Sequence, residues 1–345
     1  MVKGPPVDPF TRGQSGSRPG RWLAWLLLGA GATVSTLSHG QVAPPSGPLS
    51  VEPALPIDPT PTETSKGHGS VSVGYQNTYV NGMFLPVPGG KAPIGYVRVQ
   101  SISFDVNYFF ADRWSAQLGI PYVEGRYRGP APHCITTAPP QCQGQVVPLQ
   151  PHPESRFLDD GSYHGAWQDW NVGAAYHGNI DDYLLTPTVI AYLPSHHYTF
   201  FGNAAVGQDV RKLELAIDLA HQFELSNVYY RMRAGHVFAE KTLGQSIDYN
   251  KLDLELGYFI DETWTAKVFG SGKKGKGYTG NYDQTTEEWY HHDQRAEHNY
   301  ANVGTGMDYH MNDKYTVSAT VQRLVWGQFV FDFKYSFDVH LTRQF

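Results

Sequence analysis

The sequence predicts an all-β protein: a transmembrane, antiparallel, up-and-down β-barrel of about twelve strands that follows a disordered N-terminal tail. Three observations lead to this prediction. Apolar and polar residues alternate with a period of two in about a dozen segments, short and long connections alternate between those segments, and aromatic residues flank the short connections. Period-two alternation is typical of a strand with one apolar face. After residue 40 the chain has no helical apolar stripe and no apolar run long enough for a membrane-spanning helix.

The composition agrees with this fold class and excludes several others. The 345 residues include 36 Gly and 22 Tyr, and only 17% are charged, which favours strands and tight turns. The net charge of −6 argues against a general nucleic-acid binder, because such proteins carry a basic patch. Two Cys are too few for a disulfide-dense scaffold or a four-thiolate metal site. We expect no metal and no cofactor.

Residues 1–40 have the order of a signal peptide. Arg18 and Arg21 precede an apolar run that starts at Trp22, and small residues follow it down to Gly40. The run is shorter than the roughly 20 apolar residues of a membrane anchor. We therefore expect export and cleavage after Gly40. Residues 41–67 are rich in Pro and lack periodicity, which predicts a disordered periplasmic tail before a barrel at 68–345.

The expected strands share the period-two alternation. They lie at about 70–80, 95–109, 114–124, 166–177, 183–193, 206–223, 228–238, 246–260, 264–272, 299–310, 314–323 and 329–342. The last strand is the clearest, and one of its faces is expected to contact lipid: Phe329, Phe331, Phe333, Tyr335, Phe337, Val339 and Leu341. Leu254 is expected to face lipid in the same way. Such a run of about 15 residues exceeds the usual strand of a soluble protein.

The connections divide into a short and a long class. The short ones are expected at 111–113, 178–182, 224–227, 261–263 and 311–313, and the long ones at 81–94, 125–165, 194–205, 239–245 and 273–298, with a brief one at 324–328. In outer-membrane barrels the short turns face the periplasm and the long loops face outward. Aromatic residues next to the short turns predict an interfacial girdle: Phe109, Phe110, Trp114, Tyr176, Tyr183, Phe223, Trp264, Tyr309 and Tyr315.

The end of the chain resembles the C-terminal signature of outer-membrane proteins. Phe345 is terminal, with Phe337, Val339 and Leu341 at alternating earlier positions, although Arg343 stands where an apolar residue is usual. The resemblance implies that the barrel-assembly machinery is a partner and reads Phe345.

Charged residues on the inward faces are the candidate pore lining. They are Arg231, Arg233, Lys267, Asp105, Asp169, Glu214, Asp218, Asp253, Glu255, Asp332 and Lys334. Carboxylates prevail among them, which argues against strong anion selectivity. We expect most of them to pair across the lumen, and Arg231 and Arg233 are the best candidates for a constriction.

The long loops carry weaker signals. Cys134 and Cys142 are expected to form a local disulfide in an exported protein. Loop histidines, at 196, 197, 291, 292 and 298, are expected to be solvated rather than metal ligands. The stretch 272–280 lacks the phosphate-loop spacing and is expected to be an exposed basic loop that could touch lipopolysaccharide. Outer-membrane lipid and lipopolysaccharide are thus expected partners.

Three short motifs carry a family resemblance. A third strand with Leu118-Gly119-Ile120-Pro121-Tyr122 is followed by Trp167-Gln168-Asp169-Trp170-Asn171-Val172-Gly173 and by Ala191-Tyr192-Leu193-Pro194. With the signal peptide and about twelve strands, the layout over 68–345 is similar to the outer-membrane transporter-like family named for the MetA pathway of phenol degradation. The resemblance implies uptake of aromatic or other small hydrophobic compounds, without catalytic residues.

Three functions were compared. The first is an outer-membrane channel of a Gram-negative bacterium for passive uptake of a small, hydrophobic or aromatic substrate. The alternative is a structural or adhesive barrel whose extracellular loops bind partners. A barrel enzyme of the phospholipase kind needs Ser, His and a polar orienting residue together on the lipid-facing surface. No His-x-Ser pair lies on an expected strand, so we do not expect an enzyme.

Overall fold

The computed structural model describes residues 66–85, 90–129, 152, 154, 156–276 and 286–345. All of them belong to one compact unit, His39–Phe345. The predicted cleavage after Gly40, the tail at 41–67 up to residue 65, and the pair Cys134 and Cys142 lie outside the described residues. No helix within the described ranges is both long and apolar enough to cross a membrane; this finding says nothing of crossing by strands.

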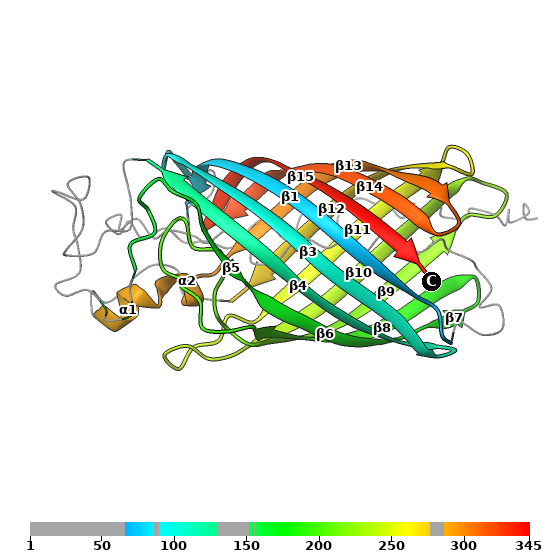
Figure 1. Ribbon diagram of the computed structural model, residues 1–345, viewed down its shortest axis with the longest axis horizontal. Coiled ribbons are helices and arrows are strands. Elements are labelled where there is room, and N and C mark those ends of the chain that lie inside the picture. The colour runs from blue at the N-terminus through cyan, green and yellow to red at the C-terminus, as the bar shows by residue number, and fades with distance from the viewer. Residues whose placement is uncertain (1–65, 86–89, 130–151, 153, 155, 277–285) are drawn as a thin grey trace, which may run out of the picture. The chain divides into compact units, whose positions relative to one another are not determined.

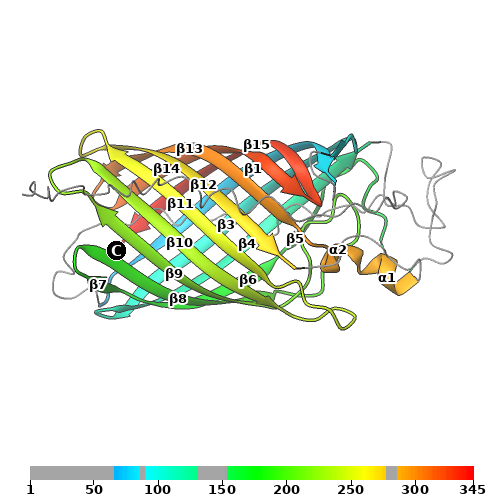
Figure 2. The ribbon, with the colours of Figure 1, turned by 180° about the vertical axis from the view of Figure 1, so that it is seen from behind.

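The described strands form one closed antiparallel sheet (Figures 1 and 2). Their order runs from β15 down to β1, and β15 pairs with β1 to close the barrel. The strands are β1 (Gly69–Phe84), β2 (Lys91–Ala92), β3 (Tyr96–Ala111), β4 (Trp114–Arg128), β5 (His164–Trp167), β6 (Asp169–Tyr176), β7 (Gly178–Ile180), β8 (Tyr183–Pro194), β9 (Lys212–Gln222), β10 (Val228–Ala239), β11 (Tyr249–Phe259), β12 (Trp264–Gly275), β13 (Asn299–Asn312), β14 (Tyr315–Gln328) and β15 (Val330–Gln344).

The wall has twelve strands, as the sequence predicts. Segments β5, β6 and β7 are consecutive parts of one wall strand, because β5 and β6 both pair with β4 while β6 and β7 both pair with β8. The short β2 only extends the end of β1. Closure leaves no open sheet edge in the wall, which is the condition for a strand protein to exist in hydrocarbon.

The outer face of the wall is apolar and the inner face is polar. On β3, Ile102 is 43% exposed and Phe104 is 44% exposed, whereas the alternating Ser101 and Ser103 are buried. Leu254 on β11 is likewise exposed, as expected. This inversion of the usual soluble pattern fits a barrel whose outer surface contacts lipid and whose lumen is polar.

The last strand departs from its expected face at one end. From Tyr335 to Leu341 the outward alternation is observed, but Phe329, Phe331 and Phe333 are buried, so the lipid-facing prediction was wrong for these three residues. The reason is a bulge: Tyr79 pairs with Tyr335 while the next residue, Val80, pairs with Phe333. Skipping one residue reverses the face of every side chain beyond it.

The two ends of the barrel differ. Short turns connect the strands at one end, and two short helices, α1 (Thr286–Tyr290) and α2 (His292–Arg295), lie at the other, where the long loops are (Figures 1 and 2). We call these the short-turn end and the long-loop end. Aromatic rings of the predicted girdle meet at the short-turn end, with Trp114 5.1 Å from Tyr176 and Trp264 4.6 Å from Tyr309 between ring centroids.

Several boundaries differ from expectation at the long-loop end. Strand β1 continues to Phe84 instead of 80, β4 to Arg128 instead of 124 and β12 to Gly275 instead of 272. The strand expected at 206–223 begins only at Lys212, because residues 206–210 belong to a buried loop segment. The brief connection expected at 324–328 is instead part of β14. At the short-turn end, Phe345 and Gly69 exchange backbone hydrogen bonds of 2.9 Å each, which joins the terminal strands.

Candidate functional site

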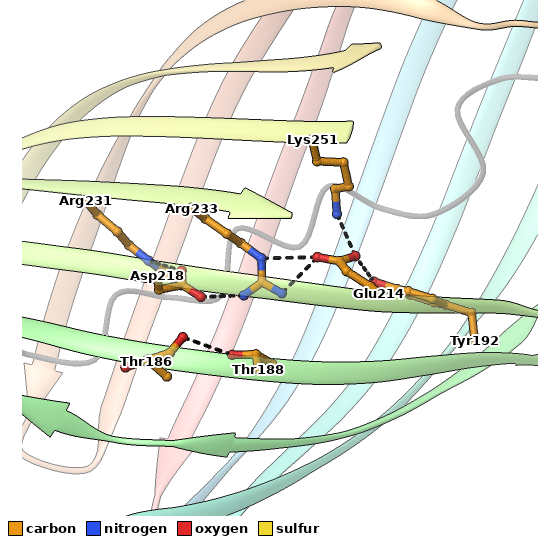
Figure 3. Close-up of polar contacts among 8 residues, drawn as sticks. All are labelled: Thr186, Thr188, Tyr192, Glu214, Asp218, Arg231, Arg233 and Lys251. Carbon is orange, nitrogen blue, oxygen red and sulfur yellow. Dashed lines mark hydrogen bonds and ion pairs between the residues drawn. The ribbon is translucent and has the colours of Figure 1, made fainter. Parts of the chain in front are cut away.

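One wall of the lumen, formed by β9, β10 and β11, carries a network of ion pairs (Figure 3). Alternation places its members on the inward face. The inward charged residues are Lys212, Glu214 and Asp218 on β9, Arg231 and Arg233 on β10, and Lys251, Asp253 and Glu255 on β11. Of these, Glu214, Asp218, Arg231, Arg233 and Lys251 form the ion pairs. We call this the charged wall.

Asp218 binds both arginines of the charged wall. Arg231 donates to Asp218 Oδ1 from Nε at 3.0 Å and from Nη2 at 2.7 Å, and Arg233 Nη1 donates to Oδ2 at 2.6 Å. Arg233 Nη2 also donates to Glu214 Oε1 at 3.0 Å. The planar guanidinium suits such multidentate pairing with carboxylates. The arginines are therefore held in fixed positions beside the lumen.

Glu214 joins three strands. It is 1% exposed and accepts hydrogen bonds from Lys251 Nζ at 3.1 Å and from Tyr192 on β8 at 2.9 Å. The Lys251 contact crosses β10 at Gly235, which stands opposite both Ala216 and Lys251. A Cβ at Gly235 would lie 3.1 Å from the Ala216 Cβ and 3.3 Å from the Leu215 carbonyl oxygen, so β9 leaves little room for a side chain at this position.

The other predicted pore-lining residues are distributed around this network. Lys267 on β12 binds Asp308 on β13 at 2.8 Å and 3.0 Å, which makes a second buried ion pair. Glu255 accepts a hydrogen bond from Tyr229 at 2.9 Å, and Asp253 lies opposite Arg233 in the strand register. The remaining inward carboxylates are Asp169, which accepts from Tyr198 at 2.6 Å, and Asp105, which lies opposite Ser72 and Gly119.

Asp332 and Lys334 do not join the network of the charged wall. Asp332 pairs with Lys334 at 2.8 Å and with Lys91 of β2 at 3.0 Å. Lys334 is the residue that the β15 bulge skips, and its side chain is 41% exposed. These two candidates therefore lie at the long-loop end of β15, near the outer surface.

The wall formed by β14, β15, β1 and β3 presents mainly hydroxyl groups. Ser72 pairs with Thr342 and Thr78 with Ser336, each at 2.8 Å between oxygens. We call this the hydroxyl wall. Its inward charges are few and include Asp105 and the Asp338–His340 pair at 2.7 Å. The lumen thus has two chemically different sides.

Three loop segments pack together at the long-loop end: 156–163, 198–211 and 286–298. Asp159 accepts hydrogen bonds from Asn203 Nδ2 at 2.7 Å and Ala204 N at 2.9 Å. Gln294 Nε2 donates to the carbonyl of Gln208 at 2.6 Å, and Gln208 Nε2 donates to that of Asp293 at 3.2 Å. We call these segments the packed loops.

The packed loops also contact the inner wall of the barrel. Ala204 and Val206 belong to one buried apolar cluster with Val97 of β3 and with Val123 and Tyr127 of β4. Phe331 and Phe333 of β15 belong to the same cluster. The loops therefore narrow the mouth of the barrel from inside.

An open pocket lies among the packed loops. Its volume is about 1660 Å³, and rings and apolar groups line it together with several histidines. Phe157, Tyr198, Phe200, Tyr290, His164 and His291 are among its lining residues. We call it the vestibule. Phe200 and Tyr290 lie 4.8 Å apart between ring centroids and are both buried. Charged residues also line the vestibule, among them Arg156, Asp209 and Lys241.

Several titratable groups of the loops are perturbed. Burial, and then the charge of Asp159, raises the pKa of Asp293 well above its usual value. Burial, and then the charges of Lys273 and Lys212, holds the pKa of His298 well below its usual value. His197 binds Asp209 at 2.7 Å, and this hydrogen bond raises the pKa of the imidazole. Asp293 and His298 therefore favour their neutral forms in the packed loops.

Sequence reasoning missed Lys251, Lys273 and Tyr192. All three lie on inward faces that alternation already defines, so counting inward lysines and tyrosines as well as carboxylates could have found them. Of the stretch 272–280, only residues up to 276 are described, with Lys274 exposed and Lys273 3.9 Å from the Tyr249 ring. Within the described residues, no group of three His, Cys, Asp or Glu is arranged to hold a metal ion.

The comparisons with known proteins concern the fold. An outer membrane channel from Pseudomonas putida F1 matches with a TM-score of 0.59 at 12% identity, over 82% of this chain and 97% of that chain. The NanC porin matches with a TM-score of 0.45 at 9% identity, over 80% and 98%. No protein-family model and no curated protein matches this sequence. The fold is that of an outer-membrane β-barrel.

Proposed function

We propose that the protein is an outer-membrane channel of a Gram-negative bacterium for passive uptake of small molecules, oriented with the long-loop end outside. The observation that carries the proposal is a closed wall whose outer face is apolar and whose lumen has a fixed charged wall opposite a hydroxyl wall. In this orientation the signal peptide directs export and the assembly machinery reads Phe345.

The substrates that we propose are small aromatic or hydrophobic molecules. The vestibule supports this choice, because the half-buried Phe157 lines it beside the buried rings of Phe200 and Tyr290. Aromatic pairs add about 0.5–1.5 kcal/mol beyond the area that they bury. A solute held there would next meet the charged wall, whose opposite charges could orient its dipole. The family resemblance of the sequence points to the same class of compound, and family membership is part of this proposal.

We propose that Arg231 and Arg233 line the constriction of the channel and that the channel selects only weakly between cations and anions. Both guanidinium groups are already paired with Asp218 or Glu214, so little net charge faces the lumen at that level. Strong anion selectivity would need arginines without competing carboxylates. We therefore propose that size and ring chemistry, rather than net charge, restrict passage.

Planar-bilayer conductance of the refolded mature protein tests the proposal. We expect small steady channels that simple aromatic compounds block, and faster entry of those compounds than of sugars of equal mass into proteoliposomes. A correctly inserted barrel that passes neither ions nor aromatic solutes would overturn it. That result would favour the alternative, a structural or adhesive barrel, for which the packed loops at the mouth are the favouring observation.

A further inference from the structure

The outer face of β3 and β4 changes from apolar to basic at the long-loop end. Along β3 the exposed side chains run from Phe110 to Ile102, which is about 27 Å along the strand at about 3.4 Å per residue. The next outward positions are Gln100 and Arg98. On β4, Arg126 stands directly opposite Arg98 in the register. Like charges placed opposite one another on neighbouring strands are destabilising.

Within the described residues, no carboxylate pairs with the positive charge of either of these two arginines. Neither Arg98 nor Arg126 forms an ion pair with the described residues, and Glu124, which faces outward on β4, is opposite Gln100 instead. Arg98 Nη2 donates to the Tyr335 hydroxyl at 3.4 Å, and its guanidinium lies 5.8 Å from the Tyr79 ring. The Arg126 guanidinium lies 4.5 Å from the Tyr163 ring. The Nε of Arg126 is buried without a hydrogen-bond partner. An unmet buried donor on a cation is costly, so an external acceptor would stabilise this arrangement.

Two lysines extend the positive charge across β1 to β15. Tyr79 of β1 is opposite both Arg98 and Tyr335, and its ring stacks on that of Tyr335 at 5.8 Å. Lys334 is next to Tyr335, and it shares the single carboxylate of Asp332 with Lys91. We define the outer basic patch as Lys91, Arg98, Arg126 and Lys334. Two carboxylates, Asp332 and the outward Glu124 of β4, lie in the same region as these four cations, so the patch keeps a net positive charge.

The outer basic patch is confined to one side of the barrel. Strands β15, β1, β3 and β4 lie side by side in Figure 1. On the opposite side, the corresponding outward residues are Leu213 of β9, Phe238 of β10 and Asn250 of β11, and the single outward lysine on the described strands there is Lys274 of β12, opposite Asn250 in the register. A belt needed only for general membrane anchoring would surround the barrel. The local concentration of cations, just beyond the apolar band and among tyrosines, indicates a specific anionic ligand at headgroup depth.

We propose that the outer basic patch binds the phosphate of a phosphorylated glycolipid of the outer leaflet, the lipid A part of lipopolysaccharide. Guanidinium groups match phosphate oxygens in a bidentate manner, and the opposed Arg98 and Arg126 can share one phosphate. This site differs from the basic stretch 272–280 considered from the sequence. It depends on the orientation of the barrel in the membrane and is independent of what the channel transports.

Native mass spectrometry of the full refolded chain in detergent, titrated with purified diphosphoryl lipid A, tests the proposal. We expect the double variant Arg98→Gln, Arg126→Gln to lose about tenfold or more in apparent affinity, the order expected for lost charge-assisted hydrogen bonds. The matched control Lys241→Gln, Lys274→Gln removes the same charge from exposed positions near the same end of the barrel, outside the patch, and should bind like the parent. Equal binding by the parent and the arginine variant would overturn the proposal.

Two further arms identify the ligand. Dephosphorylated lipid A and phosphatidylethanolamine should bind much more weakly than diphosphoryl lipid A, and equal binding would show acyl-chain adhesion instead. Millimolar inorganic phosphate should fail to displace the lipid, and full displacement would show a free-anion site. If the glutamine variant fails to fold, Arg98→Lys, Arg126→Lys keeps the charge and loses the guanidinium geometry. We expect weaker binding from it, and unchanged affinity would overturn the bidentate assignment.

Discussion

The charged wall and the hydroxyl wall of the lumen use the same strand alternation for different chemistry. On β9 and β10, Glu214, Asp218 and Arg233 form buried ion pairs, whereas on β1 and β15 short hydroxyl side chains pair with one another. Charges in a low-dielectric environment interact strongly but need complete pairing, because an unpaired buried ion is expensive. Hydroxyl pairs contribute less to the free energy of folding, and breaking one destabilises the protein less. The comparison therefore predicts that single changes in the charged wall have the larger effects.

The largest effect is expected for Glu214→Gln. This change leaves Arg233 and Lys251 with one fewer anion between them, and breaking such a buried network costs about 3–5 kcal/mol. Urea unfolding of the refolded barrel in lipid vesicles measures the loss. Thr188→Val, at a buried inward position of β8 outside the ion pairs, is the control. Equal losses for the two variants would mean that losing a buried charge costs no more than losing a buried hydroxyl group.

Leu254→Arg tests the outer face of the charged wall. Leu254 is exposed between the inward Asp253 and Glu255, so an arginine there would enter the hydrocarbon. We expect destabilisation of about 2–4 kcal/mol. Heat-modified gel mobility and vesicle refolding yield measure it, with Asp253→Asn as the inward control. Normal insertion of the arginine variant would contradict the lipid-facing assignment.

Removing both arginines tests the electrostatics of the lumen. Arg231→Ala together with Arg233→Ala removes both arginines that pair with Asp218 and leaves Lys251 as the cation beside Glu214. We expect the cation-to-anion permeability ratio to rise several-fold, because the carboxylates that the arginines no longer neutralise attract cations into the lumen. The reversal potential in a salt gradient measures this ratio. An unchanged potential would show that these residues do not face the conducting path.

Asp293→Asn tests the packed loops at the long-loop end of the barrel. The pKa of Asp293 is raised in the packed state, so its contribution to loop packing is complete below the usual aspartate pKa and is lost as pH rises towards the raised value. The pH dependence from His298 has the opposite sign. The pKa of His298 is lowered in the packed state, so its contribution to loop packing decreases as the pH falls below the usual histidine pKa.

The difference between parent and Asp293→Asn isolates the aspartate. Protease cleavage of the loops of the parent should rise with pH above the usual aspartate range relative to the variant. His292, 3.2 Å from Asp293, and Asp159 are the other charged groups to which this difference is sensitive. Parallel pH profiles for the two proteins would exclude Asp293 as the titrating group.

The smallest effect is expected for Ser72→Ala in the hydroxyl wall. The change removes one hydroxyl pair with Thr342, which contributes about 0.5–1.5 kcal/mol. The same urea measurement that is used for Glu214→Gln gives the comparison directly. A loss as large as that of Glu214→Gln would mean that the two walls contribute equally to stability.

Alternation, connection length and aromatic placement predicted most of the barrel, because they are local. A strand exposes every second residue to one face whatever its neighbours are, so residues such as Leu254 and Glu214 could be assigned from position alone. The twelve-strand count followed from the same pattern. The inward position of Arg231 and Arg233 could also be predicted, although their partners could not.

Only the tertiary structure decided features that depend on register or on distant segments. A bulge opposite Tyr79 turned Phe331 and Phe333 inward and left Lys334 outside, because one skipped residue reverses every later face. Lys251 of β11 binds Glu214 of β9 across the intervening strand β10. Residues 206–210 form a loop instead of extending the strand, because Val206 packs in an apolar cluster with residues of β3 and β4. Local pattern specifies which face a side chain prefers, whereas closure of the barrel determines which side chains meet.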